Sequence, residues 1–545
     1  MKKRSLALFM VLILMITSMN FIFAQEEQEV ILEVIQEATI KNVIILVPDG
    51  TRMDSITLAR WYNGGGPLAM DEFACGLVRT YNSDSPIADS APAANAMATG
   101  FKSKTGFIGV LPDENSMPGL APLAEGDKRR PVASVLEAAQ LANKATGLVA
   151  TSEVMHATPA AFSSHYPDRS AYDILSKHMV YNNVDVVFGG GYEFMMPEGR
   201  DDEENMVSVL EAKGYEVLTS KEEFTSFDGD KAWGLFADAS LPYDFDNNGS
   251  VPTLEAMTEK AISTLSKDED GFFLLVEGSK VDWASHANDP IGIISDLLAF
   301  DKAVKVALDY AKENQDTVVI IVPDHGNGGI SIGNSSLNKG YDKEPLSSFL
   351  DPLKAATLTG EGIATKLNAD RSNIVEVMAT YYGITDLTEV EIAAIKEVKL
   401  SSMNATVGPM ISERAKIGWT TTGHTGEDVV LFIYAPDQDR LTGVVENTDI
   451  ALYIARKLGV NLAETTSALF VPARQGFEAK GATVAWNGTD INNPIISVTK
   501  GENLLELFVH TNKAVYNGTD VELNGVIVYN GISTYVPQDA IDLIQ

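Results

Sequence analysis

The sequence predicts a three-layer α/β/α protein, in which helices cover both faces of a central, mostly parallel sheet. A C-terminal β-rich module follows. Two observations predict this fold. Continuous apolar, β-branched runs alternate with helical segments up to about residue 460, which is typical of a sheet covered by helices on both faces. After about residue 463 the long helical segments stop and Asn-Gly dipeptides recur, which is typical of hairpins.

The apolar runs of the first part are the candidate strands of the sheet. They lie at 42–47, 185–188, 272–276, 317–322 and 429–434. Three of these runs lead into a carboxylate, namely Asp49, Glu277 and Asp324. Because ligands of open α/β sheets bind beyond the carboxyl ends of the strands, we expect these side chains to meet in one crevice.

The N-terminal segment has the layout of a secretory signal. Basic residues at 2–4 precede an apolar stretch, and the segment ends on Ala24. We interpret 1–24 as a signal peptide and 25–41 as an acidic leader, which predicts a secreted or extracytoplasmic protein, in the periplasm or at the cell surface. An uncleaved membrane anchor is the alternative. Cleavage after Ala24 would place Ile22 at the third position before the cleaved bond, where a small residue is typical. No later stretch is long enough to span a bilayer.

The charge balance excludes several classes of partner. The chain has 41 Lys and Arg against 75 Asp and Glu, a formal net charge of −34, which argues against nucleic acid and anionic membranes. An anionic substrate would therefore need a local positive centre. The single cysteine, Cys75, excludes an intrachain disulfide, so the fold must depend on its core and on bound metals.

Ser90 is the candidate nucleophile. It follows Asp89 at the start of a run of small helix formers that Gly100 ends. The first turn of a helix presents unpaired N–H groups and a partial positive charge, which stabilise an oxyanion or a phosphate. The alternative is an ordinary Asp-Ser helix cap.

Histidines and carboxylates gather in patterns that suit a metal. Asp324-His325 follows a strand, Glu277 is followed by Asp282 and His286, and His424 lies between two Thr-Gly steps. Carboxylate oxygen and imidazole nitrogen are the ligands that zinc accepts when no cysteine is offered. With only seven histidines in the chain, this set is a candidate metal site.

Together with Ser90, these residues resemble the alkaline phosphatase family over most of residues 42–436. The motifs are Pro48-Asp49-Gly50, Asp89-Ser90-Ala91, His156-Ala157-Thr158 with His165 and Arg169, Glu277-Gly278 with Asp282 and His286, Asp324-His325-Gly326, and His424-Thr425-Gly426. The resemblance implies a catalytic domain at 42–460 that hydrolyses small-molecule phosphate monoesters at alkaline pH through a phosphoserine intermediate. It also implies a homodimer.

The resemblance further implies two Zn²⁺ and one Mg²⁺ per subunit. The first zinc would be held by Asp282, His286 and His424, the second by Asp49, Ser90, Asp324 and His325, and the magnesium by Asp49, Thr158 and Glu277. Six positive charges against four carboxylates would supply the positive centre that an anionic substrate needs. Arg169 would bind two phosphate oxygens through its guanidinium fork.

His156 and Trp283 mark a branch within the family, because other alkaline phosphatases can carry an aspartate and a lysine at these positions. The affinity for the third metal and the strength of phosphate binding are therefore open. We expect His165 to have a structural role near the site, and His178 and His510 to be plain surface or core residues.

A second metal pattern stands apart from this set. Asp244, Asp246, Asn248 and Glu255 have the oxygen-ligand spacing of a calcium loop. One hypothesis is a structural Ca²⁺. The other is an Asx-rich turn without metal, which the unusual Pro252 favours.

The C-terminal module at 463–545 is similar to the domain named after the N-terminus of copper amine oxidases. The similarity lies in 470–474, 477–484 and 534–537. Its only histidine is His510, so attachment, assembly or stabilisation fits better than catalysis, and contact with a cell surface is one such role.

Two other functions compete with phosphomonoester hydrolysis. One is a phosphodiesterase or sulfatase of the same superfamily, although no Cys/Ser-x-Pro-x-Arg nucleophile motif of a sulfatase is present. The other is a non-catalytic phosphate-binding surface protein. A missing metal ligand or nucleophile would favour this alternative, and none of the expected residues is missing.

Overall fold

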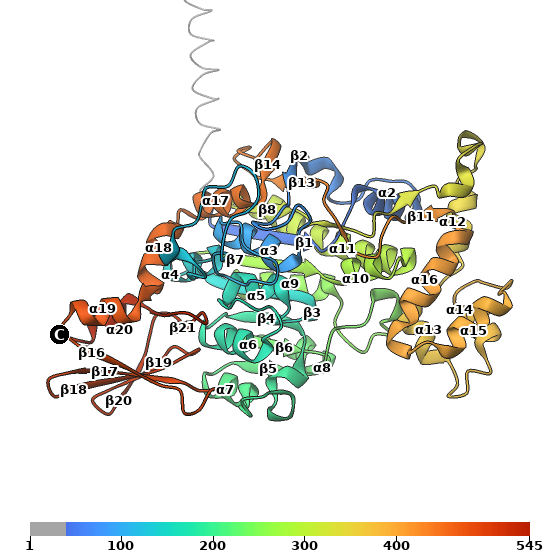
Figure 1. Cartoon of the computed structure of the whole chain (residues 1–545). Helices are drawn as coiled ribbons and strands as arrows, with labels where there is room; N and C mark the ends of the chain where they lie inside the picture. Colours follow the sequence, from blue (N-terminus) through green and yellow to red (C-terminus); the bar gives the residue numbers. More distant parts are fainter. Residues whose placement is uncertain (1–39) are drawn as a thin grey trace, which may run out of the picture.

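The computed structural model describes residues 40–545 and contains a central ten-stranded sheet (Figure 1). The proposed signal peptide, 1–24, lies outside the described residues, as does nearly all of the acidic leader. In spatial order the strands are β14 (Gly443–Glu446), β2 (Ala74–Arg79), β13 (Val429–Tyr434), β8 (Thr317–Ile321), β1 (Asn42–Pro48), β7 (Phe272–Gly278), β3 (Ala145–Glu153), β4 (Val186–Gly190), β6 (Ala232–Leu235) and β5 (Glu216–Leu218). All five strands expected from apolar runs are present.

The sheet is mostly parallel, as predicted. β1 runs parallel to both neighbours, β8 and β7, and the parallel pairing continues from β7 through β3, β4 and β6 to β5. The exception is β13, which is antiparallel to β8 and to β2. The carboxyl ends of β8, β1 and β7 therefore lie next to one another at one edge of the sheet.

Helices cover both faces of the sheet. The side chains of each strand point alternately to the two faces, so they enter two different hydrophobic cores. Ile44 and Leu46 of β1 belong to one hydrophobic cluster, and Val43, Ile45 and Val47 to the other. The first core is completed by α2 (Met53–Tyr62), α8 (Lys221–Ser226), α9 (Leu254–Leu265), α10 (Lys280–His286), α11 (Pro290–Asn314), α12 (Ser347–Lys354), α13 (Gly360–Lys366), α14 (Ile374–Tyr381), α15 (Glu389–Glu397) and α16 (Met403–Arg414). The second is completed by α3 (Ser90–Thr99), α4 (Val135–Leu141), α5 (Ala157–Ser163), α6 (Tyr172–Tyr181), α7 (Met206–Ala212), α17 (Asn447–Leu458) and α18 (Leu462–Leu469). The predicted α/β/α layering is confirmed.

No helix within residues 40–545 has both the length and the apolar character needed to cross a membrane.

The C-terminal module has its own sheets and its own core. A five-stranded antiparallel sheet is formed by β16 (Thr483–Asn487), β17 (Ile495–Lys500), β18 (Asn503–Phe508), β19 (Lys513–Tyr516) and β20 (Thr519–Glu522). A smaller sheet contains β15 (Val471–Pro472), β22 (Thr534–Val536) and β21 (Val528–Tyr529), and the helices are α19 (Ala473–Ala479) and α20 (Gln538–Asp542). Phe477, Val498 and Leu505 lie in its core. The predicted β-rich region is confirmed.

The Asn-Gly dipeptides differ in what they do. Asn517-Gly518 forms a two-residue hairpin turn with φ values of 50° and 81°, as expected for this pair. Asn530-Gly531 begins a longer connection between β21 and β22, and Asn487-Gly488 begins the wide loop between β16 and β17. Asn524-Gly525 joins no hairpin, because Leu523 and Ile527 instead donate backbone hydrogen bonds to the turn between β18 and β19.

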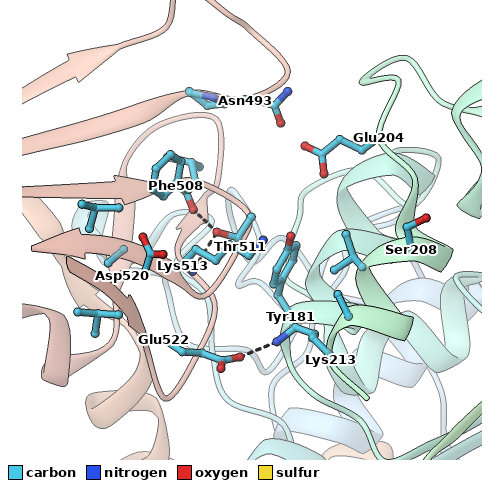
Figure 2. Close-up of a pocket in the computed structure, with 17 residues that line it drawn as sticks. Tyr181, Glu204, Ser208, Lys213, Asn493, Phe508, Thr511, Lys513, Asp520 and Glu522 are labelled. Carbon is cyan, nitrogen blue, oxygen red and sulfur yellow. Dashed lines mark hydrogen bonds and ion pairs between the residues drawn. The ribbon is translucent and has the colours of Figure 1, made fainter. Parts of the chain in front are cut away.

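The module packs on the α/β part of the chain beside α6 and α7 (Figure 1). Tyr181 of α6 shares a small hydrophobic cluster with Val528 and Tyr535. Lys213, which follows α7, pairs with Glu522 of β20 at the rim of a cavity of about 920 Å³ (Figure 2).

Two buried histidines also join the two parts. The backbone N–H of His165 donates to Nδ1 of His178, so Nε2 of His178 carries the proton and donates to Nδ1 of His510, 2.9 Å away. The sequence left open whether His178 and His510 are surface or core residues; both are buried, and they are paired across the junction rather than isolated. His165 is buried between the Glu137 carboxylate and the Gly109 carbonyl.

Because both histidines are neutral in this arrangement, we expect the junction to weaken in acid. Burial lowers the pKa of His178, and it lowers the pKa of His510 to about 3. Below about pH 6.5 the unfolded histidines bind protons that the folded ones do not, so stability falls as pH falls, by about 1.4 kcal/mol per pH unit for each histidine. Calorimetric melting temperatures between pH 8 and pH 5 test this, and His510→Gln should show a shallower decline. An equal decline in both proteins would contradict the assignment.

Candidate active site

The three carboxylates expected at strand ends do meet. Asp49 follows β1, Glu277 lies at the end of β7, and Asp324 follows β8, and all three are buried. Burial raises the pKa of Asp49, and the neighbouring Asp324, Asp282 and Glu277 carboxylates raise it further. The edge that the parallel strands form is therefore the candidate site.

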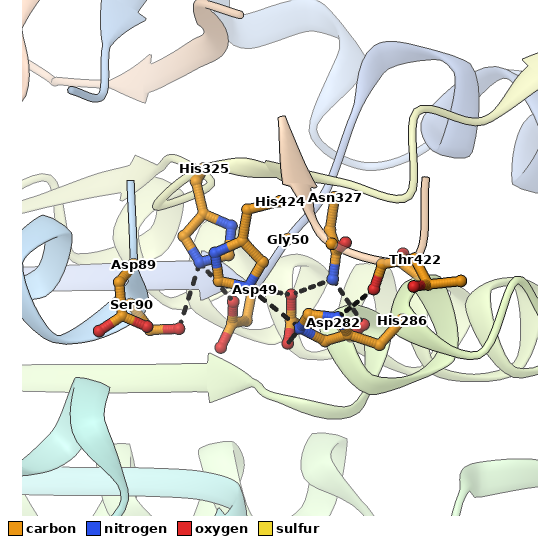
Figure 3. A network of polar contacts seen from close by, with 12 residues as sticks. Asp49, Gly50, Asp89, Ser90, Asp282, His286, His325, Asn327, Thr422 and His424 are labelled. Atoms are coloured by element: carbon orange, nitrogen blue, oxygen red, sulfur yellow. Dashed lines mark hydrogen bonds and ion pairs between the residues drawn. The ribbon is translucent and has the colours of Figure 1, made fainter. Parts of the chain in front are cut away.

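One group of possible metal ligands consists of Asp282, His286 and His424 (Figure 3). Asp282 and His286 are four residues apart on α10 and so share one face of the helix. His424 belongs to β12 (His424–Thr425), which pairs with β9 (Gly326–Asn327). Nε2 of His286 lies 3.0 Å from Nε2 of His424 and 3.3 Å from Oδ2 of Asp282. Three ligand atoms thus converge on one point.

Neighbouring groups orient these ligands, and sequence reasoning missed all of them. Nδ1–H of His286 donates to the Thr422 carbonyl and Nδ1–H of His424 donates to the Ala88 carbonyl, each over 2.7 Å. Both rings therefore turn Nε2 toward the convergence point. The amide of Asn327 donates to Oδ1 of Asp282 over 2.7 Å. Backbone carbonyls leave no residue-specific signal in a sequence, so the contacts of the two histidines could not have been found there.

The second group consists of Asp49, Asp324 and His325, with Ser90 beside them. Nε2 of His325 lies 3.2 Å from Oδ2 of Asp324, 3.6 Å from Oδ1 of Asp49 and 3.2 Å from Oγ of Ser90. The rings of His325 and His424 stack with centroids 3.8 Å apart, so the two groups adjoin (Figure 3).

Gly50 allows the two groups to come this close. Its φ is +64°, and a Cβ at this position would lie only 2.5 Å from Oδ1 of Asp282. The glycine of the Pro-Asp-Gly motif is therefore required by the approach of the β1 end to α10.

Ser90 is the first residue of α3, as the sequence predicts, and Gly100 ends the helix in the left-handed conformation. The ordinary-cap alternative does not describe Asp89, because its side chain makes no cap hydrogen bond. Instead the Asp89 carboxylate accepts from Arg169 over 2.6 Å and from the Gly106 N–H over 3.2 Å. Ser90 is almost fully buried and turns its hydroxyl to His325.

The third expected set, Asp49, Thr158 and Glu277, contains buried oxygens that lack hydrogen-bond partners. These are both carboxylate oxygens of Asp49 and of Glu277 and the hydroxyl of Thr158. Burial raises the pKa of Glu277 to about 8. Buried, unpaired carboxylates are costly unless a cation neutralises them, so the donor set fits a hard divalent ion such as Mg²⁺.

The remaining expected residues lie at the rim. Arg169 holds Asp89 with one nitrogen, and another lies 3.1 Å from Nε2 of His156. Burial and the nearby Arg169 guanidinium lower the pKa of His156 to about 3, so its ring is neutral. Trp283 packs edge to face against His156, with ring centroids 5.8 Å apart.

The four calcium candidates do not form a comparable group. The Asp246 carboxylate accepts hydrogen bonds from the backbone N–H groups of Thr359 and Gly362 and from the Thr359 hydroxyl, which caps α13. Asn248 accepts from Ser250 within its own turn, and Glu255 lies in the first turn of α9. Within residues 40–545, Asp244, Asp246 and Glu255 are not among the acidic clusters that could hold an ion. This arrangement gives the calcium hypothesis no support.

Comparison with known proteins agrees with this geometry. The family model for alkaline phosphatase matches residues 40–460. The chain belongs to the alkaline phosphatase family. It is 35% identical to alkaline phosphatase 3 of Bacillus subtilis over 443 residues, which covers 78% of this chain and 90% of that protein. It is 32% identical to the repressible alkaline phosphatase of Saccharomyces cerevisiae, with 78% and 82% covered.

Solved structures give the same result. A cold-active alkaline phosphatase from Shewanella sp. superimposes with a TM-score of 0.66 at 30% identity, over 76% of this chain and 99% of that one. A TAB5 alkaline phosphatase with a His-to-Asp substitution has Mg bound in its M3 site, and it superimposes with a TM-score of 0.56 at 26% identity over 78% of this chain and all of that one. A copper amine oxidase N-terminal domain model matches residues 457–543. This alkaline phosphatase is a metal-binding hydrolase of phosphate monoesters.

Proposed function

We propose that Ser90 is the nucleophile and that hydrolysis proceeds through a phosphoserine. The observation that carries the proposal is the position of Oγ of Ser90, which lies at the start of α3 and 3.2 Å from Nε2 of His325, in the second group of candidate ligands. Oγ would attack phosphorus in line, the alcohol would leave with a proton, and water would then release inorganic phosphate and restore the serine.

We propose that the three ligand sets hold two Zn²⁺ and one Mg²⁺. Asp282, His286 and His424 would hold one zinc, Asp49, Asp324, His325 and Ser90 the other, and Asp49, Thr158 and Glu277 the magnesium. When bound, these ions would neutralise the carboxylates, lower the pKa of the serine hydroxyl and of water, and stabilise the leaving oxygen.

The chain's own residues would bind and orient the phosphoryl group. Arg169 would present its guanidinium fork to two phosphate oxygens, and Asp89 would hold that guanidinium in place through its 2.6 Å contact. The N–H groups at the start of α3 would add partial positive charge beside the attacked phosphorus. The neutral His156 would leave Arg169 without a competing positive charge.

His156 also determines how well the third site holds magnesium. His156→Asp is expected to lower the Mg²⁺ concentration for half-maximal activity about tenfold or more, since a carboxylate two residues before Thr158 suits a hard cation better than imidazole. Activity of chelator-treated protein during Mg²⁺ titration measures this, and Zn²⁺ titration of both proteins is the control. An unchanged Mg²⁺ requirement would show that His156 does not influence the site.

We further propose that residues 1–24 direct export, that the catalytic domain spans 42–460 and the module 463–545, and that the protein is a homodimer. The basic and apolar layout of residues 1–24 supports export, the two family matches at 40–460 and 457–543 support the domains, and the resemblance to the family supports the homodimer.

The function is tested by phosphate release from a chromogenic monoester at about pH 9 to 10, beside a diester with the same leaving group. We expect the monoester to be the better substrate, and chelation to abolish activity that zinc and magnesium together restore. A faster diester reaction would favour a phosphodiesterase. A folded, metal-loaded protein with no activity on either ester would favour phosphate binding without catalysis.

A further inference from the structure

An exposed tryptophan, Trp486, and a half-buried tyrosine, Tyr529, form an aromatic pair on the C-terminal module. Trp486 lies at the end of β16 and Tyr529 in β21, with ring centroids 4.9 Å apart and planes 45° apart. Trp486 is 45% exposed although it is among the largest side chains of the module. A Cβ at Gly488 would lie 2.6 Å from Nε1 of Trp486, so the glycine lets the loop after β16 pack closely against the indole. The pair is thus held by strands and a close loop.

Two depressions share this aromatic pair. The first, of about 730 Å³, lies between the module and α6 and is also lined by Tyr166, Tyr172 and Phe194. The second, of about 610 Å³, lies on the module alone, between α19 and the connection from β21 to β22. Both volumes are in the range of small-molecule sites. Because Trp486 and Tyr529 line both, one extended occupant can contact the pair from either side.

The polar groups around the pair can recognise hydroxyl groups. Asp173, Asp201 and Asn492 line the first depression, and Gln475, Ser533 and Thr534 line the second. Carboxylates, amides and hydroxyls are hydrogen-bond partners for a polyhydroxylated ligand. The C–H faces of sugar rings pack against aromatic rings, whose apolar bodies remain available here.

The charges around the pair argue against a polyanion. Three aspartates line the first depression, and the lysine there, Lys177, is buried and paired with Asp202 and Glu204. In the second depression Arg474 pairs with Glu478. With a formal net charge of −34 for the whole chain, an anionic polymer would be repelled.

We propose that Trp486 and Tyr529 form the binding surface for a neutral polysaccharide, whose sugar rings occupy the two depressions on either side of the aromatic pair. This proposal is independent of the catalytic mechanism. Ser170, Ala171 and Tyr172 line the first depression and directly follow Arg169, so the polysaccharide would bind close in sequence to the segment that carries the phosphate-binding arginine. The module would thereby hold the enzyme on a glycan.

The test uses the full metal-loaded protein in native gels that contain xylan, galactomannan, mixed-linkage β-glucan or soluble starch, with polygalacturonic acid as a polyanion. We expect retardation by at least one neutral polysaccharide, reduced tenfold or more by Trp486→Ala and retained largely by Trp486→Phe. Trp61→Ala is the matched control, because Trp61 is similarly exposed at 43% but lies on α2. Phosphate release from a chromogenic monoester should be unchanged in all three variants, which checks folding.

Three outcomes would overturn the proposal. The first is no retardation of the unaltered protein by any of the neutral polysaccharides. The second is equal retardation of the unaltered protein and Trp486→Ala. The third is retardation by polygalacturonic acid alone, which would indicate a site for anionic chains elsewhere.

Discussion

Ser90→Ala is expected to lower kcat for a phosphate monoester by roughly a thousandfold or more, because no phosphoserine can form. Ser90 is one of the proposed ligands of the second zinc, but Asp49, Asp324 and His325 remain in the variant, so it should still bind metals and phosphate. Initial rates with a chromogenic monoester measure the loss. Intact-mass analysis after acid quenching should find one added phosphoryl group on the unaltered protein and none on the variant.

Ser220→Ala is a suitable control for this experiment. Ser220 also stands at the start of a helix, where its hydroxyl accepts from the Glu223 N–H, but it is far in the chain from every candidate ligand. Its replacement should cost about 1 kcal/mol of stability and leave the rate unchanged. Should Ser90→Ala retain most of the activity while Ser220→Ala behaves as expected, another group would have to be the nucleophile.

The meeting of the strand-end carboxylates could be predicted because it follows from sheet topology. β8, β1 and β7 are continuous apolar runs, and parallel neighbours bring Asp324, Asp49 and Glu277 to one edge whatever the details of packing. The position of Ser90 was predictable from local sequence, since small helix-forming residues lie between Asp89 and Gly100, which mark the two ends of its helix.

Other features depend on tertiary contacts that have no local signal. The pairing of His178 with His510 joins residues 332 positions apart, and neither histidine stands in a pattern that distinguishes it from an isolated core residue. The antiparallel direction of β13 likewise cannot be read from an apolar run, which is the same in either direction. The spacing made Asp246 a candidate calcium ligand, with an Asx-rich turn as the alternative, but nothing nearby in the sequence reveals that Thr359 and Gly362 use its carboxylate.

The same buried carboxylates are expected to make stability depend on divalent metals. Removal of divalent ions is expected to lower the melting temperature, and to lower it more at pH 8 than at pH 5. Burial and the neighbouring Asp324 carboxylate raise the pKa of Asp49, and burial raises the pKa of Glu277 to about 8. Between about pH 4.5 and pH 8 the metal-free folded protein therefore holds protons that the unfolded chain has lost. This retention of protons lowers its stability as pH rises, by about 1.4 kcal/mol per pH unit for Glu277, and acts against the opposite effect of the histidine pair.

Bound cations should remove this dependence, since they take the place of those protons. Scanning calorimetry of metal-free and metal-loaded protein at pH 5, 6.5 and 8 measures the difference. The metal-loaded protein is the reference because it shares every other titrating group, including the histidine pair at the junction, whose effect on stability has the opposite sign. In Glu277→Gln the metal-free decline should be shallower, because a neutral amide has no proton to lose. If the two forms of the unaltered protein changed in parallel with pH, the buried carboxylates would not be the site of metal binding.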